Sequence, residues 1–143
     1  MEKQHALQQL EQLQKKLYAI HYACSAMNLD ADTVAPKNTS EGRGVALGVL
    51  AGEEQQLMIC PETRALLDEL DRQKDELDLL HRREVEELRR RCDQLTRIPA
   101  EEYIAYSELV NKAGDVWHKA KEKDDYEFIT TITDYDICFA HTG

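Results

Sequence analysis

Three prolines, Pro36, Pro61 and Pro99, divide a chain of 143 residues in which apolar side chains otherwise recur every three or four positions. That spacing places the apolar side chains on one face of an α-helix. Over about residues 2–28 the stripe consists of Leu7, Leu10, Leu13, Leu17, Ile20, Cys24 and Met27. The chain is therefore expected to form amphipathic helices whose ends lie near the prolines.

The first break is expected at residues 30–38, because Pro36 and the flanking Asp and Asn residues favour a turn. Thr39 or Ser40 is a candidate N-cap for a second helix over about 41–59. A third helix should start at Pro61, since proline fits the first helical position.

From Glu62 to Arg97 the sequence has neither Gly nor Pro. One helix of this length would be unusual in a small domain, so a break is expected at 73–76, giving a helical hairpin. The run HRREVEELRRR, at 81–91, alternates in charge at helical spacing and predicts a solvent face with ion pairs. Another helix should open at Pro99.

These patterns predict an all-α fold, a bundle of four or five mostly antiparallel helices with an irregular loop near 29–39. We expect a helical domain over residues 1–128. Residues 129–143 begin with a β-branched run and then lack a helical period, which predicts a frayed tail or a short extended segment.

Gly44, Gly48 and Gly52 form a stripe along the second helix. Each costs about 1 kcal/mol of helix propensity relative to Ala, so another backbone is expected to pack closely there. A phosphate-binding loop is excluded, because the glycine spacing is one residue too long and no strand precedes it. Trp117 is expected to be a core residue that packs the last helix. The rest of its expected buried stripe is Tyr103, Tyr106, Val110, Ala113 and Ala120.

A formal net charge of −10 argues against nucleic acid and anionic membranes as partners. No apolar run approaches the roughly 18 residues that a membrane span needs. The four cysteines lie far apart without a C-x-x-C pair, which favours reduced thiols and a cytoplasmic location.

The histidines give no sign of a catalytic metal site. None of the five is followed by Glu, so H-E-x-x-H, which would supply two zinc ligands and a general base, is absent. His21 and His118 are expected to be satisfied surface or core residues. Asp30 and Asp32 are explained by capping within a turn. From the residues alone we predict no catalytic residue, no metal ligand and no cofactor.

The order of motifs resembles the N-terminal region of the carboxypeptidase Taq family of zinc metallopeptidases. That family has a W-D-x-x-T-x-M-P loop, an Arg-led helix with small residues, a Pro-Glu helix start, an Arg/Glu-rich helix and a Pro-Ala-Glu start before a helix with Trp. Leu29 and Ala35 depart from that pattern, standing where its Trp and Met are expected. The resemblance covers about residues 17–128 and is carried by Asp30, Thr33, Pro36, Arg43, Leu50, Pro61, Glu62, Arg97, Pro99, Ala100, Glu101 and Trp117.

The resemblance implies a helical part that flanks the substrate cleft of a much longer, homodimeric enzyme. In the family, the zinc ligands and the catalytic Glu come from a region beyond residue 143, so zinc is expected only in a full-length relative. This predicts a non-catalytic fragment or relative of a metallocarboxypeptidase. Within it, Asp30, Asp32, Thr33, Pro36 and Arg43 would have structural roles in the signature loop and helix start.

Three origins stay open: a truncated gene, a shifted reading frame, and a free-standing relative. An alternative function is a free-standing helical interaction module with no connection to peptidases. The expected partner is a second copy of the chain, in a dimer, or the missing C-terminal part of the enzyme.

Overall fold

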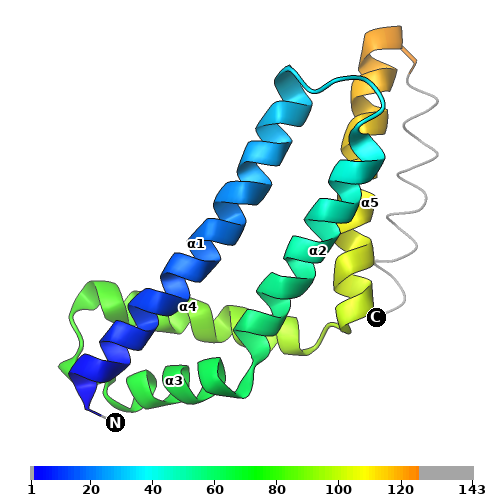
Figure 1. Ribbon diagram of the computed structural model, residues 1–143. Helices are drawn as coiled ribbons and strands as arrows, with labels where there is room; N and C mark the ends of the chain where they lie inside the picture. The colour runs from blue at the N-terminus through cyan, green and yellow to red at the C-terminus, as the bar shows by residue number, and fades with distance from the viewer. Residues whose placement is uncertain (1, 126–143) are drawn as a thin grey trace.

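The computed structural model describes residues 2–125, which form five α-helices and one short 3₁₀ helix (Figure 1). The described part contains no strand, so the all-α prediction is confirmed. In chain order the elements are α1 (Lys3–Thr33), α2 (Ser40–Ile59), α3 (Pro61–Arg72), η1 (Lys74–Glu76), α4 (Leu79–Thr96) and α5 (Ala100–Lys123). The expected tail at 129–143 lies outside the described residues.

The helices pair in antiparallel fashion (Figure 1). Helix α1 runs toward the loop at 34–39, α2 runs back from it, and α5 lies along α2 in the opposite direction. Helices α3 and α4 form a hairpin that crosses the end of the molecule far from this loop. No helix in the described part of the chain is both long and apolar enough to cross a membrane.

The core lies where the first half of α1 meets α2, α3 and α4. Leu10, Met58, Leu67 and Leu70 have at most 1% of their surface exposed. Burying a side chain of this size stabilises the fold by about 1.5–3 kcal/mol. The remaining members of the buried cluster are Ala6, Leu13, Leu17, Leu66, Leu77, Val85, Cys92 and Leu95.

The break after the first helix is shorter than predicted. Asp30, Asp32 and Thr33 lie in the last turn of α1, and only residues 34–39 are irregular. Nothing before Val34 breaks a helix, whereas Pro36 disfavours helical geometry at the residue that precedes it. Asn38 takes a left-handed conformation, with φ 68°.

The predicted break at 73–76 is present. Helix α3 ends at Arg72, and the short helix η1 leads into α4. Asp78 caps α4, since its Oδ1 accepts a hydrogen bond of 3.0 Å from the backbone N–H of His81. This bond and the contact with the His81 ring lower the pKa of Asp78. The cap fixes where the second arm of the hairpin begins.

The predicted buried stripe of α5 is wrong in part. Trp117 is 48% exposed, and Tyr106 and Val110 are exposed by more than half. Helix α5 instead turns Ile104, Glu108 and Asn111 toward α2. The face of α5 that packs against α2 is therefore not its most apolar face. The glycines of α2 leave room for the larger side chains that α5 places there.

Candidate functional site

The loop that carries the family-like signature is closed by hydrogen bonds of its own. The carbonyl of Asp30 accepts hydrogen bonds from the N–H groups of Val34 and Ala35, at 3.0 and 2.9 Å. Thr33 Oγ1 donates to the carbonyl of Leu29 at 2.6 Å. These contacts satisfy backbone groups that the end of a helix leaves free.

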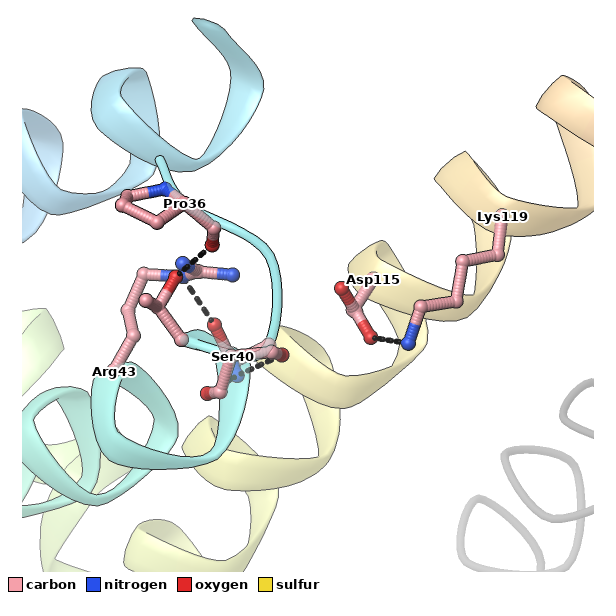
Figure 2. A network of polar contacts seen from close by, with 7 residues as sticks. Pro36, Ser40, Arg43, Asp115 and Lys119 are labelled. Atoms are coloured by element: carbon pink, nitrogen blue, oxygen red, sulfur yellow. Dashed lines mark hydrogen bonds and ion pairs between the residues drawn. The ribbon is translucent and has the colours of Figure 1, made fainter. Parts of the chain in front are cut away.

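On the other side of the loop, Thr39 occupies the N-cap position of α2, as predicted, but its side chain does not cap the helix. Thr39 Oγ1 donates instead to the carbonyl of Pro36 at 2.8 Å, a contact drawn in Figure 2. Pro36 and Thr39 thus hold the loop in a compact turn.

Arg43 joins the start of α2 to α5. Its Nε donates to Asn111 Oδ1 at 3.0 Å, and Asn111 Nδ2 donates to the carbonyl of Ser40 at 2.9 Å (Figure 2). One amide side chain therefore serves two groups of α2. Asp115 and Lys119 form an ion pair of 2.7 Å along α5 nearby. Sequence reasoning singled out Arg43 but not its partner Asn111, which lies 68 residues away.

Asp32 reaches across to α5 rather than capping a turn, which corrects our expectation. Its Oδ1 lies 2.9 Å from Nε2 of His118. The ring of His118 meets the ring of Trp117 edge-on at 5.1 Å between centroids, and the Lys121 ammonium lies 5.0 Å from the Trp117 centroid. Trp117 therefore contributes to a surface cluster of polar and aromatic groups.

The glycine stripe faces α5. A Cβ on Gly44 would lie 3.0 Å from Asn111 Nδ2, and one on Gly52 would lie 3.0 Å from Ile104 Cδ1. At Gly48 a Cβ would lie 2.9 Å from Oε1 and 3.0 Å from Cγ of Glu108. Helix α5 packs closely along this stripe, and the atoms nearest to the three glycines are side-chain atoms of α5.

A second group of polar residues joins four helices around Glu54, which is 7% exposed. His21 Nε2 of α1 lies 2.8 Å from Glu54 Oε1, and the Arg91 guanidinium of α4 pairs with the same oxygen. Tyr103 of α5 lies close enough to Glu54 and Arg91 for the charges of both to act on its phenol. A buried carboxylate without such partners would be costly. We call Glu54, His21 and Arg91 the Glu54 cluster.

Two neighbours of the Glu54 cluster have perturbed acidity. Burial raises the pKa of the Cys24 thiol, and the negative charge of Glu54 raises it further. Burial and Glu54 also raise the pKa of the Tyr103 phenol, against the opposing effect of Arg91. A raised pKa keeps the Cys24 thiol protonated, so it is not set up as a nucleophile.

The Glu54 cluster was not identified from the sequence, although a signal was present. Glu54 follows Leu47 by seven residues and precedes Met58 by four, so it lies on the buried face of α2. Arg91 was assigned to a solvent face with its neighbours in the charged run. That assignment holds for Arg83 and Arg90, which pair with Glu86 and Glu87 three residues along the helix.

A groove of about 1040 Å³ separates the second half of α1 from α2 and α5. Cys24 and Asn28 line it from α1, and Tyr106 and Val110 line it from α5. Among residues 2–125, no three His, Cys, Asp or Glu side chains are grouped so that they could hold a metal ion. The polar contacts at both ends of the groove join helices to one another.

Fold and site together define a helical scaffold that is fastened by interhelical polar contacts. The family model of the carboxypeptidase Taq (M32) metallopeptidases matches residues 9–138. This match covers most of the chain and extends ten residues past 128, where we expected the resemblance to end. The chain belongs to the carboxypeptidase Taq (M32) family.

Two comparisons agree with this assignment. The chain is 31% identical over 121 residues to Carboxypeptidase 1 of Bacillus subtilis (strain 168), an alignment that covers 83% of this chain. It also superposes on the crystal structure of BsuCP with a TM-score of 0.84 and 27% identity over 90% of its length. The chain spans 24% and 26% of the length of these two relatives.

Proposed function

We propose that this chain is a non-catalytic helical scaffold that corresponds to the N-terminal region of a zinc metallocarboxypeptidase. Membership in the family supports the connection with peptide hydrolysis. The alignment with about a quarter of Carboxypeptidase 1 supports a role as one part of a larger enzyme. Removal of C-terminal residues from peptides would then belong to a longer family member.

The engagement of Arg43 and Glu54 in helix-to-helix contacts is the observation that carries this proposal. Arg43 is bonded to Asn111 of α5, and Glu54 is shared by His21 and Arg91. A general base needs free access to a water or substrate proton, whereas Glu54 is buried beneath its two partners. The sequence also lacks H-E-x-x-H, so we assign the binding of zinc to a full-length relative.

The exposed apolar side chains support a partner. Tyr18, Tyr22 and Leu29 on α1 and Val45 and Val49 on α2 are each more than half exposed. Exposed patches beyond a few hundred Å² usually mark interaction sites. For the isolated chain we propose a homodimer. Repulsion from the net charge of −10 is screened beyond about 8 Å at physiological salt. In a full-length relative, the region outside the matched part would cover the corresponding side chains.

The proposal includes a cytoplasmic location, which is supported by Cys24, Cys60 and Cys92 being free thiols.

The test uses the purified chain, a peptide with a free C-terminus and added zinc. We expect no release of C-terminal residues. Mixing the chain with a Carboxypeptidase 1 of Bacillus subtilis that lacks the matched region should restore activity to that shortened enzyme. A variant with the core residue Leu67 changed to Asp is the matched control, since it cannot supply the folded scaffold. Peptide cleavage by the chain alone, abolished by a chelator, would refute the proposal.

The oligomeric state is measured separately by light scattering after size exclusion. A mass of twice 16.5 kDa is expected. A single species at 16.5 kDa at micromolar concentration would contradict the dimer without affecting the activity test.

A further inference from the structure

The second half of α1 carries the longest stretch of the sequence without Asp, Glu, Lys or Arg. It runs from Leu17 to Leu29, thirteen residues of a chain in which 32% of the residues are charged. The structure describes the whole stretch, and Leu17 is its only buried residue. Depletion of charge together with enrichment in Tyr and Met distinguishes the core of a protein–protein interface from other surface. This part of α1 therefore has the composition of a surface that a partner covers.

The most exposed apolar side chains of the stretch share one face of the helix. Tyr18, Tyr22 and Leu29 are 69, 65 and 65% exposed, and their spacing of four and seven residues keeps them on one side. The rings of the two tyrosines lie 6.0 Å apart. Ser25 and Ala26 lie between the tyrosines and the leucine and are also exposed. We call these five residues the tyrosine face. Figure 1 shows this half of α1 at the edge of the molecule.

The charges at the two ends of the stretch indicate which partner fits. Lys15 and Lys16 precede it, and both are exposed. Asp30 and Asp32 follow it, and both are exposed as well. Two antiparallel copies would place the basic end of one stretch beside the acidic end of the other, whereas parallel copies would place like charges together. The stretch is therefore complementary in charge to a second, antiparallel copy of itself.

We propose that two copies of this chain pair in antiparallel fashion through the tyrosine face, about a two-fold axis that passes near Tyr22. Tyr18 lies four residues before this axis and Ala26 lies four residues after it. The pairing thus sets a large side chain of one copy against a small one of the other, and the axis repeats the contact. This interface rests on the dimer proposed above and specifies how that dimer forms.

The same register pairs the ends of the stretch. Lys15 lies seven residues before the axis and Leu29 lies seven residues after it. The stem of Lys15 covers Leu29 of the partner subunit, and its ammonium reaches the partner's Asp30. Within its own helix Lys15 pairs with Glu11 at 2.7 Å, and both of these side chains are about 60% exposed. The lysine therefore remains accessible to a second carboxylate.

The available area is near the lower limit for a specific interface. A fully covered tyrosine buries about 150–250 Å². The four tyrosines of the pair, each about two-thirds exposed, therefore provide roughly 400–700 Å². Leu29, Ala26 and the stem of Lys15 from both copies bring the total toward the roughly 1,000 Å² that a specific dimer needs. The dimer should be reversible, and contact through an uncharged face limits the repulsion between two chains of net charge −10.

Cross-linking with a carbodiimide, which joins an amine directly to a carboxylate, tests the register. Lys15 and Asp30 of one chain are fifteen residues apart on a continuous helix, a distance of about 22 Å. A cross-link between them therefore requires two copies in antiparallel pairing. We expect this cross-link, identified by mass spectrometry, in the species of twice 16.5 kDa. Asp30→Asn should abolish it. A dimer that gives no Lys15–Asp30 cross-link would overturn the proposed register.

Tyr22→Glu tests the axis, because it sets two carboxylates against each other where the copies meet. Sedimentation equilibrium over a concentration series should show a dissociation constant raised by at least about tenfold. Tyr106→Glu is the matched control, since Tyr106 is 62% exposed, lies on α5 and acquires the same charge. This control should change the dissociation constant by less than about twofold. Circular dichroism of both variants should match that of the unchanged chain.

Three results would overturn the interface. They are a mass of 16.5 kDa for the unchanged chain over the whole series, a dimer that tolerates Tyr22→Glu, and a dimer that Tyr106→Glu weakens equally. The first result would also refute the proposed dimer, whereas the other two would refute only the tyrosine face as its interface. The scaffold role is tested separately, by restoring activity to the shortened enzyme.

Discussion

Replacing Gly48 by alanine should destabilise the fold even though alanine is the better helix former. Gly48 lies on the face of α2 that packs against α5. A Cβ there would lie 3.0 Å from Glu108 Cγ and 3.3 Å from Ile104 Cγ2. Each atom is bonded directly to the Cβ of its residue, so it cannot swing clear without a change of the χ1 rotamer. Room for the new Cβ therefore requires such a change or a shift of α5 away from α2.

Two opposing terms set the magnitude. Alanine in a helix interior gains about 1 kcal/mol over glycine, while overpacking a filled site costs about 1–3 kcal/mol. The free energy of unfolding of Gly48→Ala should therefore fall by up to about 2 kcal/mol. Gly114→Ala is the matched control, because a Cβ at Gly114 would meet nothing within 4 Å. This control should gain most of the propensity term.

The assay is urea unfolding followed by circular dichroism. The two alanine variants should differ in free energy of unfolding by about 1–3 kcal/mol, with Gly114→Ala the more stable. A Gly48→Ala protein that is stabilised as much as Gly114→Ala would refute the close packing of α2 on α5.

Two further predictions concern Leu67 and Cys24. Leu67 is 1% exposed, so Leu67→Ala should lower the free energy of unfolding by about 2–5 kcal/mol in the same assay. Tyr18→Ala, at a side chain 69% exposed, should change it by less than about 0.5 kcal/mol, and equal effects would contradict the core described above. The raised pKa of Cys24 should delay its alkylation, so that the reaction accelerates at a higher pH than the alkylation of a free thiol does. The extent of alkylation is measured by mass spectrometry of the Cys24 peptide. Glu54→Gln should shift this profile to lower pH, and a profile that does not move would exclude Glu54 as a cause of the shift.

The helix boundaries could be predicted because their signals are local. Pro61 and Pro99 mark helix starts within one residue, and the hairpin break falls at the predicted 73–76. Only one boundary was misplaced, at the end of α1. There, aspartates that favour turns were given more weight than the absence of a true helix breaker before Val34.

The sites were harder to predict because they depend on how helices rotate against one another. The exposure of Trp117 follows from the packing of α5 on the glycines of α2. Ile104 and Glu108 contact these glycines, so the face of α5 that carries Trp117 lies toward solvent. No spacing within α5 contains this information. Likewise, the contact between Asp32 and His118 spans 86 residues.

The Glu54 cluster shows which part of such information a sequence does carry. Glu54 lies on the buried face of α2, and Arg91 lies beside the apolar stripe of α4, three residues after Leu88 and four before Leu95. A helix turns by about 100° per residue, so Arg90 can face solvent while Arg91 faces the next helix. An acid and a base that each flank an apolar stripe on different helices must find partners when the stripes pack, since burying either alone is costly. Flanking position therefore indicates that Glu54 and Arg91 need interhelical partners, and only the packing of the helices decides that they pair with each other.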